Sequence, residues 1–298
     1  MRIAIVGAAG QLGTELQRQL PALSGEIVPL NRQAIDLVSA DSVAAALDAA
    51  RPELVINAAA YNFVDRAEEE PQAAWSVNAL GPRNLALWCE AAGAALLHVS
   101  TDYVYSGRTF EGTRRIDHST PYGECDAPLP VNAYGVSKLA GEYFVRALCR
   151  RHFVVRTCGL YGRGAATKGN FVETMLRLGR ERPELRVVAD QHCTPTSAAE
   201  LARAIIGLAK TDACGLYHAT SSGQTTWHGF AVEIFRQAGL DVAVHAVTSE
   251  EYGAKARRPA YSVLDCQKLN ALLDPPLSTW REALAEYLAD RESPSSIA

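Results

Sequence analysis

The sequence predicts an α/β fold in which a doubly wound parallel sheet carries a smaller C-terminal α/β lobe. Short runs rich in Val and Ile alternate with alanine-rich helical segments, and this alternation is typical of parallel strands joined by crossover helices. A glycine-rich turn follows the first run directly, and 298 residues suffice for a large core. The predicted strands are 3–6, 27–30, 54–56, 96–99 and 153–155, and the predicted helices are 11–20, 42–50, 72–92 and 133–150.

The regular alternation ends near residue 160, which divides the chain into two predicted parts. Residues 1–160 form the sheet domain, and residues 161–298 form mostly the smaller lobe, from which the chain can cross back into the sheet. The tail from Arg291 to Ala298 is expected to be frayed. In the second part we predict helices at 170–180, 199–208 and 226–238 and strands at 186–188 and 215–218.

Composition excludes several classes of partner. A net charge of -4 and a pI near 6.0 give no basic surface for nucleic acid or an anionic membrane. The seven Cys form no CxxC pair and no zinc-ligand spacing, which favours reduced thiols in a cytoplasmic protein. The apolar stretch from Met1 to Val6 is too short for a signal sequence or a membrane span. We therefore expect a cytoplasmic protein that binds neither nucleic acid nor membrane.

Three glycines at Gly7, Gly10 and Gly13 lie between the first strand and the first helix, as in the Rossmann fold. There the tight turn and bare backbone let a pyrophosphate sit on the helix N-terminus. The second strand ends in Asn31-Arg32 with no acidic residue for ribose hydroxyls, and Arg32 suits a 2′-phosphate. This favours NADPH, with NADH as the alternative. The predicted cofactor-binding residues are Gly7, Gly10, Gln11, Leu12, Gly13, Asn31, Arg32, Asp36, Leu37, Ala58, Ala59, Ala60, Asn78, Tyr134 and Lys138.

Three side chains are candidates for carbonyl redox chemistry. Tyr134 and Lys138 are four residues apart on a predicted helix, so the phenol and the ammonium share a face, where the positive charge is expected to lower the pKa of the phenol. Thr101 follows the fourth strand, at the edge of the sheet where ligands bind. If they converge, Tyr134 is a proton donor, Lys138 tunes it and Thr101 polarises the carbonyl oxygen.

Together these motifs resemble the extended short-chain dehydrogenase/reductases, and within them the dTDP-4-dehydrorhamnose reductase family. The resemblance covers nearly the whole chain. It is carried by Gly7-x-x-Gly10-x-x-Gly13, Asn57-Ala58-Ala59-Ala60-Tyr61, Val64 to Glu68, Asn78 to Ala86, Ser100-Thr101-Asp102-Tyr103, Tyr134-x-x-x-Lys138, Ser137 to Glu142, Asp190 to Thr196, Gly215 to His218, Thr225-Thr226-Trp227 and Arg257 to Ser262.

The resemblance implies reduction of the 4-keto group of dTDP-6-deoxy-L-lyxo-4-hexulose (dTDP-4-dehydrorhamnose) by NAD(P)H to dTDP-L-rhamnose. The catalytic residues would be Thr101, Tyr134 and Lys138, with the nucleotide sugar held between the two parts of the chain. By family position the sugar would meet Tyr61, Val64, Asp102 and Tyr103. The thymidine diphosphate would lie among Asn170, Phe171, Gln191, Thr196 and Arg258.

The chain departs from the family pattern in two places. Several members have a Trp in a segment like Arg-Thr-Ser-Trp, where this chain has Arg156-Thr157-Cys158-Gly159. The stretch from Gly107 to Pro121 is longer and more basic than usual, which we interpret as a solvated loop, with a lid as the alternative. Some members also form dimers through a metal bound by glutamates, and Glu15 and Glu200 occupy roughly matching positions. Because a Glu on a helix surface is normally solvated, we predict no metal, and a homodimer stays open.

Two other functions compete. A nucleotide-sugar 4-epimerase or 4,6-dehydratase uses the same Tyr/Lys pair, but a dehydratase commonly has an acidic pair after the catalytic Thr, where this chain has Asp102 and then Tyr103. The second is a non-catalytic regulatory subunit like that of methionine adenosyltransferase, which has the same fold. The His residues show no spacing that suggests metal ligands or a base.

Overall fold

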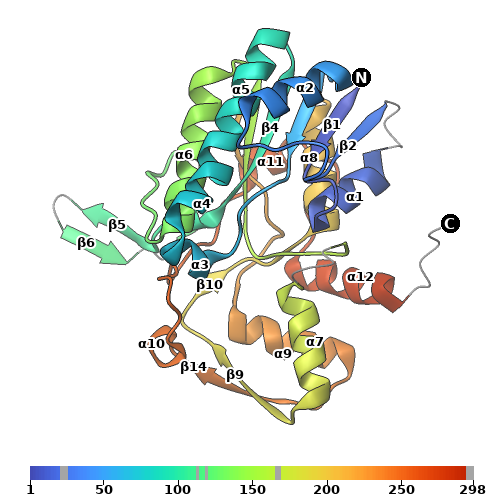
Figure 1. Ribbon diagram of the computed structural model, residues 1–298. Helices are drawn as coiled ribbons and strands as arrows, with labels where there is room; N and C mark the ends of the chain where they lie inside the picture. The colour runs from blue at the N-terminus through green and yellow to red at the C-terminus, as the bar shows by residue number, and fades with distance from the viewer. Residues whose placement is uncertain (21–25, 112–113, 118–119, 165–168, 293–298) are drawn as a thin grey trace.

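A six-stranded parallel sheet forms the centre of the larger lobe in the computed structural model (Figure 1). The structure describes residues 1–20, 26–111, 114–117, 120–164 and 169–292. The strand order is β12-β7-β4-β3-β1-β2, and all five neighbouring pairs are parallel. The predicted doubly wound sheet is thereby confirmed. Its strands are β1 (Ile3–Val6), β2 (Ile27–Leu30), β3 (Leu54–Asn57), β4 (Ala95–Thr101), β7 (His152–Thr157) and β12 (Gly215–His218).

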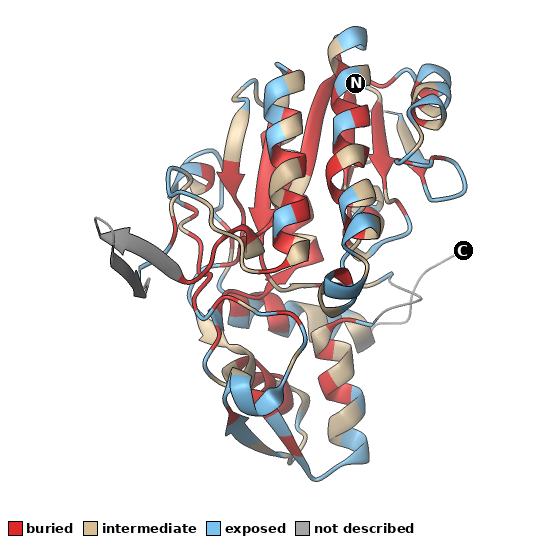
Figure 2. Ribbon diagram, turned by 60° about the vertical axis from the view of Figure 1, so that its left-hand side comes forward, coloured by how far each residue is buried: buried red, intermediate tan, exposed pale blue. Residues whose placement is uncertain are grey.

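Helices cover both faces of this sheet. Because successive side chains of a strand point to opposite faces, Ile5 packs beneath the helices of one face and Val6 beneath those of the other. Figure 2 shows the buried strands between these two layers. One layer is α1 (Gln11–Gln19) and α8 (Ala198–Ala209), and the other is α2 (Ala40–Ala50), α5 (Gly81–Ala92) and α6 (Ala133–Leu148).

The strand order of the central sheet indicates the edge at which a ligand is expected to bind. The chain runs from β1 out to β2 and then returns past β1 to β3, so the topological switch point lies between β1 and β3. The glycine turn follows β1, Ala58 to Ala60 follow β3, and Thr101 ends β4. All three segments therefore lie at the carboxyl edge of one sheet.

The helix predicted over 72–92 contains a π-helical turn. It consists of α4 (Pro71–Trp75), a π turn (Ser76–Leu80) and α5, and at the junction the Gly81 N–H bonds to the Ser76 carbonyl, five residues back. Pro82 has no N–H to donate to the Asn78 carbonyl, which explains why the regular ladder is interrupted here. A Cβ on Gly141 of α6 would lie 2.2 Å from that carbonyl oxygen. The glycine thus lets α6 pack closely on the turn that carries Asn78.

The smaller lobe lies below the sheet in Figure 1 and has its own apolar core. Its centre is β9 (Glu184–Val188), paired in parallel with β14 (Ala243–Val247), under α7 (Phe171–Glu181) and α9 (Trp227–Ala238). The chain between α7 and α9 returns to the larger lobe to form α8 and β12. The other elements are α3 (Val64–Glu69), a 3-10 turn (Asp102–Val104), β8 (Leu160–Tyr161), β10 (His192–Cys193), β11 (Thr196–Ser197), β13 (Thr225–Thr226), α10 (Ser249–Tyr252), α11 (Gln267–Asn270) and α12 (Trp280–Glu292).

Two segments differ from the sequence prediction. The stretch from Gly107 to Pro121, predicted as a loop, contains an antiparallel hairpin of β5 (Arg108–Glu111) and β6 (Arg114–Asp117), while 112–113 and 118–119 lie outside the described residues. The chain is also helical beyond Arg291, because the Arg291 guanidinium donates to Glu173 at 2.8 Å and ties α12 to α7. The rest of the tail predicted to fray, 293–298, is outside the described residues.

Candidate active site

The three predicted catalytic side chains converge at the carboxyl edge of the sheet. Thr101 is the last residue of β4, and its side chain is in hydrogen-bonding contact with Tyr134 on the first turn of α6. That turn is fixed by Asn132, whose Oδ1 accepts the Gly135 N–H at 2.7 Å. Lys138, one turn later, donates from Nζ to the Val99 carbonyl of β4 at 2.7 Å.

Burial controls the ionisation of this group. It raises the pKa of Tyr134 to about 12, opposed by the hydrogen bond with Thr101. The net shift is therefore opposite to the expected lowering, because desolvation of the phenolate and the negative charge of Asp102 both raise this pKa and outweigh the Thr101 hydrogen bond. Burial also lowers the pKa of Lys138 to about 8, opposed by the charge of Glu142. At neutral pH the phenol is protonated and most of the lysine is charged.

A buried ionic frame, formed by Glu142, Arg156, Ser100 and Tyr105, lies beneath the candidate catalytic residues and was missed by the sequence analysis. Glu142 accepts from Arg156 Nε at 2.9 Å, from Arg156 Nη2 at 2.6 Å and from Ser100 Oγ at 2.6 Å, and both charged side chains are almost fully buried. Arg156 also donates to the Tyr105 hydroxyl at 2.6 Å. The frame joins β4, β7 and α6 directly behind Thr101 and Lys138. Glu142 repeats the spacing of four from Tyr134 and Lys138, a signal that could have identified it.

The glycine turn has the shape that a dinucleotide requires. Gly7 has φ +83°, and a Cβ there would lie 2.7 Å from the Ala59 N, while a Cβ on Gly13 would lie 2.3 Å from the Gly7 carbonyl oxygen. Gly10 occupies the N-cap of α1 and has no side chain to cover the first amides. Bare backbone at a helix N-terminus beside the switch point fits a bound pyrophosphate.

The other predicted cofactor residues lie around this turn with different exposures. Asn31 forms a turn by accepting from the Gln33 and Ala34 N–H groups, and Arg32 is exposed. Asp36 is exposed and accepts the Val38 N–H, whereas the Leu37 side chain is buried. Gln11 and Leu12 begin α1, and Ala58, Ala59 and Ala60 line the turn after β3. Asn78 is almost fully buried and donates to the Tyr61 carbonyl and to Ser137 Oγ, so it anchors the loop after β3 to α6.

Of the four residues predicted to face the sugar, Tyr103 has a ring that contacts the phenol of Tyr134. Its ring meets that of Tyr134 edge to face with centroids 6.0 Å apart. Asp102 is buried and accepts from Thr101 Oγ1 at 3.1 Å and from Ser262 Oγ at 2.5 Å. Tyr61 donates from its hydroxyl to Glu70 at 3.2 Å, and Val64 begins α3. Their contacts with a sugar stay predictions.

The five residues predicted around the nucleotide already have partners within the chain. Arg258 donates to both oxygens of Asp65 at 3.0 and 2.7 Å, and the Thr196 side chain is fully buried. Asn170 caps α7 and donates to Gln11 of the cofactor helix at 3.2 Å. Gln191 donates to Ser249 at 2.8 Å, and Phe171 packs on Trp227. Sequence reasoning did not foresee these bonds, and nucleotide contact by these residues stays a prediction.

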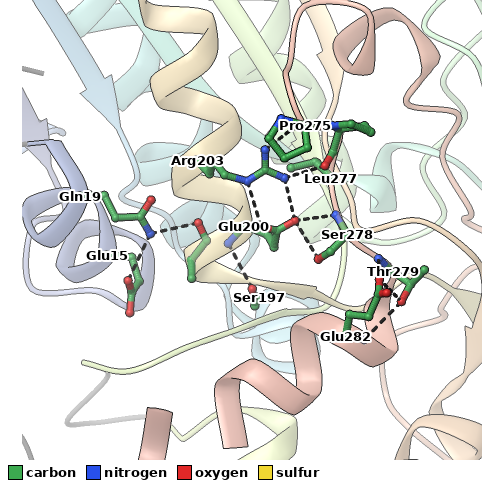
Figure 3. A network of polar contacts seen from close by, with 12 residues as sticks. Glu15, Gln19, Ser197, Glu200, Arg203, Pro275, Leu277, Ser278, Thr279 and Glu282 are labelled. Atoms are coloured by element: carbon green, nitrogen blue, oxygen red, sulfur yellow. Dashed lines mark hydrogen bonds and ion pairs between the residues drawn. The ribbon is translucent and has the colours of Figure 1, made fainter. Parts of the chain in front are cut away.

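Glu15 and Glu200 lie on neighbouring helices but are not solvated (Figure 3). Glu15 pairs with Arg18 at 2.9 Å, and Glu200 pairs with Arg203 at 3.1 Å and accepts from the Ser278 backbone at 2.7 Å. Burial opposes ionisation of Glu200, but these hydrogen bonds outweigh it and lower its pKa. In the part of the chain that the structure describes, no three His, Cys, Asp or Glu side chains are grouped as metal ligands.

Comparison with known proteins agrees with this geometry. Residues 1–293 match the family model described as RmlD substrate binding domain. A dTDP-4-dehydrorhamnose reductase of Streptomyces griseus is 41% identical over 96% of this chain and 92% of its own. The chain belongs to the dTDP-4-dehydrorhamnose reductase family. The spore coat polysaccharide biosynthesis protein SpsK of Bacillus subtilis is also 40% identical over 98% of both chains.

Solved structures of the family share this fold. The dTDP-4-dehydrorhamnose reductase of Clostridium acetobutylicum has a TM-score of 0.90 and 40% identity, covering 98% of this chain and 100% of its own. That of Bacillus anthracis, solved in complex with NADP, has a TM-score of 0.90 and 39% identity, covering 97% and 99%. A UDP-glucose 4-epimerase of Thermus thermophilus, 22% identical, shares the fold alone. Among the described residues, no helix has the length and apolar character to cross a membrane.

Proposed function

We propose that the chain reduces the 4-keto group of dTDP-4-dehydrorhamnose with NADPH and releases dTDP-L-rhamnose. The observation that carries this proposal is the convergence of Thr101, Tyr134 and Lys138 beside a glycine turn that fits a dinucleotide. Membership of the reductase family supports the same substrate, and the NADP complex of the Bacillus anthracis relative supports the cofactor.

The protein groups are suited to protonating an alkoxide. NADPH, when bound, supplies the hydride that reaches C4. Tyr134 holds its proton at neutral pH and transfers it to O4, where negative charge develops. The Lys138 ammonium, present below pH about 8, would favour the phenolate that is left and would hold the nicotinamide ribose. Thr101 donates a second hydrogen bond to O4 when its proton is not given to Asp102.

One assay tests the reaction directly. The purified protein is mixed with NADPH or NADH and a panel of nucleotide 4-ketosugars, and cofactor oxidation is followed by absorbance. We expect turnover with dTDP-4-dehydrorhamnose and identification of dTDP-L-rhamnose by NMR. If no nucleotide 4-ketosugar is reduced, the proposed function is wrong and the regulatory-subunit alternative gains support. An epimerase would instead retain NAD(H) through purification, which spectroscopy of the protein detects.

The preference for NADPH rests on Arg32. Its exposed guanidinium follows β2, where a 2′-phosphate would lie, and the loop has no carboxylate at the strand end. We expect Arg32→Ala to raise KM for NADPH roughly tenfold while leaving KM for NADH unchanged. Equal effects on both cofactors would remove Arg32 from the 2′-phosphate site.

We also propose that the enzyme works in the cytoplasm. The seven cysteines are free thiols, as expected in a reducing compartment. A homodimer is an open alternative to a monomer, and sedimentation velocity with and without EDTA distinguishes a monomer, a metal-independent dimer and a dimer linked by metal.

A further inference from the structure

A chain of hydroxyl and carboxyl groups leads from the C-terminal segment to the catalytic tyrosine. Ser262 Oγ donates to Asp102 Oδ2 at 2.5 Å, and Thr101 Oγ1 donates to Asp102 Oδ1 at 3.1 Å. Thr101 in turn contacts the Tyr134 hydroxyl. Ser262, Asp102 and Thr101 are all buried, so bulk water does not compete for these bonds.

The single proton of the Thr101 hydroxyl limits what this residue can do. The oxygen already accepts the Tyr103 N–H at 3.2 Å, and the proton points to Asp102. A hydroxyl has one donor only. While Thr101 gives that proton to the carboxylate, it cannot donate to the carbonyl oxygen of a substrate. If Asp102 carries a proton, the carboxyl group donates to Thr101, and Thr101 can donate to the substrate.

The surroundings of Asp102 raise the pKa of its carboxyl group, so that it takes up a proton at a higher pH than an exposed aspartate. Burial is the largest influence and raises the pKa of this carboxyl group to about 6, against the hydrogen bonds from Ser262, Cys158 and Thr101. The cations at this site are engaged elsewhere: Arg258 with Asp65 and the Tyr103 hydroxyl, and Lys138 with the Val99 carbonyl. Among the described residues, the titratable and charged groups around Asp102 are Cys158 directly after β7, Cys193 of β10 beside it, Tyr103, Tyr134 of α6, and Arg258, which bonds to Tyr103.

We propose that Asp102, held by Ser262, is a positioning residue that sets the direction of the Thr101 proton. With Asp102 ionised, Thr101 is turned toward it and withheld from the carbonyl oxygen. With Asp102 protonated, Thr101 donates to that oxygen while Tyr134 transfers its proton. Asp102 and Thr101 each keep their own proton through the reaction, so the only proton lost from the protein is that of Tyr134. This inference rests on the proposed reduction.

We call the path from Ser262 through Asp102 to Thr101 the relay. The pH dependence of kcat for Asp102→Asn tests whether Asp102 sets the direction of the Thr101 proton through this relay. An amide copies the protonated acid, because Nδ2 can donate to Thr101 while Oδ1 accepts from Ser262. For the wild type we expect kcat to fall up to tenfold per pH unit between about pH 6 and 7.5, as Asp102 ionises. For Asp102→Asn we expect kcat within about fivefold of the wild-type value at low pH and flat across this window. Equal pH profiles, or a loss of 100-fold or more at every pH, would overturn the proposal.

Two further variants distinguish the relay from a direct effect of the Asp102 charge on Tyr134. Ser262→Ala removes a donor to the carboxylate, so the fall in kcat should move up by about one pH unit. In Thr101→Val no hydroxyl is left to orient, and the residual activity should show no fall in this window. A fall that persists in Thr101→Val would mean that the Asp102 charge acts directly on Tyr134, which contradicts the relay.

Matched controls distinguish a failure of this inference from misfolding of a variant and from a failure of the proposed function. Asp241→Asn changes an exposed carboxylate of the smaller lobe and should reproduce the wild-type profile. NADPH binding, measured by fluorescence, and thermal melts should be unchanged in Asp102→Asn at pH about 6, where the wild-type acid is half protonated. If the wild type turns over but these profiles do not differ, the relay alone is wrong. If the wild type reduces no ketosugar, the proposed function itself fails.

Discussion

Glu142→Gln should be among the most destabilising single substitutions in the sheet domain. Glu142 is fully buried, accepts two charged hydrogen bonds from Arg156 at 2.9 and 2.6 Å and accepts one from Ser100 at 2.6 Å. The amide keeps the shape but leaves a buried guanidinium without its counter-charge and places an NH2 group against a donor. Breaking a buried pair in this way costs about 3 to 5 kcal/mol. Since domains are stable by about 5 to 15 kcal/mol, this is a large fraction of the free energy of unfolding.

Urea denaturation followed by circular dichroism measures this cost. The midpoint should fall by roughly 1 M with little change in slope. A double mutant that also carries Arg156→Met removes both charges, so its loss should be at least about 1 kcal/mol smaller than the sum of the single losses. Glu181→Gln is a matched control, because it breaks an exposed pair with Arg177 and should cost less than about 0.5 kcal/mol. A cost below about 1 kcal/mol for Glu142→Gln, or additive losses in the double mutant, would refute the reasoning.

Three further predictions concern the reaction. Tyr134→Phe should lower kcat by about 100-fold or more with the Kd for NADPH unchanged, and near-normal kcat in stopped-flow assays would exclude it as the proton donor. Gly13→Ala places a Cβ 2.3 Å from the Gly7 carbonyl oxygen and should abolish NADPH binding in fluorescence titrations, whereas Gly123→Ala, whose Cβ meets its first neighbour at 3.9 Å, should bind normally. Because the pKa of Lys138 is lowered to about 8, its ammonium is present below that pH and lost above it. The kcat/KM for NADPH should therefore fall as pH rises through about 8, and a profile flat to pH about 10 would contradict this assignment.

The fold could be predicted from the sequence because the spacing of apolar residues along each helix and strand follows which face of that element is buried. Val and Ile runs predicted the strands to within one or two residues, with β4 and β7 longer than expected. The π turn at 76–80 was missed, since the helical pattern continues through it and only Pro82 marks the fault. The β5–β6 pairing was also missed; among the described residues these two strands form a two-stranded sheet of their own, apart from the central sheet.

For the candidate site, too, the sequence predicted what depends on neighbouring residues in the chain and missed what depends on contacts between distant residues. Thr101, Tyr134 and Lys138 could be found because each stands at a fixed place on an element: a strand end, a first helical turn and the next turn. The pKa of the Tyr134 phenol is raised and not lowered as expected, because a pattern reports which charges are near but not how much water is removed. The same limit applies to Glu15 and Glu200, which were expected on a solvated surface and are buried.

At the candidate site, the sequence did not predict which groups donate hydrogen bonds and which accept them. A hydroxyl on a strand end is a donor or an acceptor according to its neighbours, and for Thr101 the deciding neighbour is Asp102, itself held by Ser262 from a segment 160 residues further along the chain. That segment also places Arg258 against Asp65 of α3 and in hydrogen-bonding contact with Tyr103. Ser262 donates to Asp102, which accepts the Thr101 hydroxyl, so a change at Ser262 alters the hydrogen bonds of the candidate catalytic threonine. Substitutions at Ser262 should therefore change kcat and its pH dependence, not only KM.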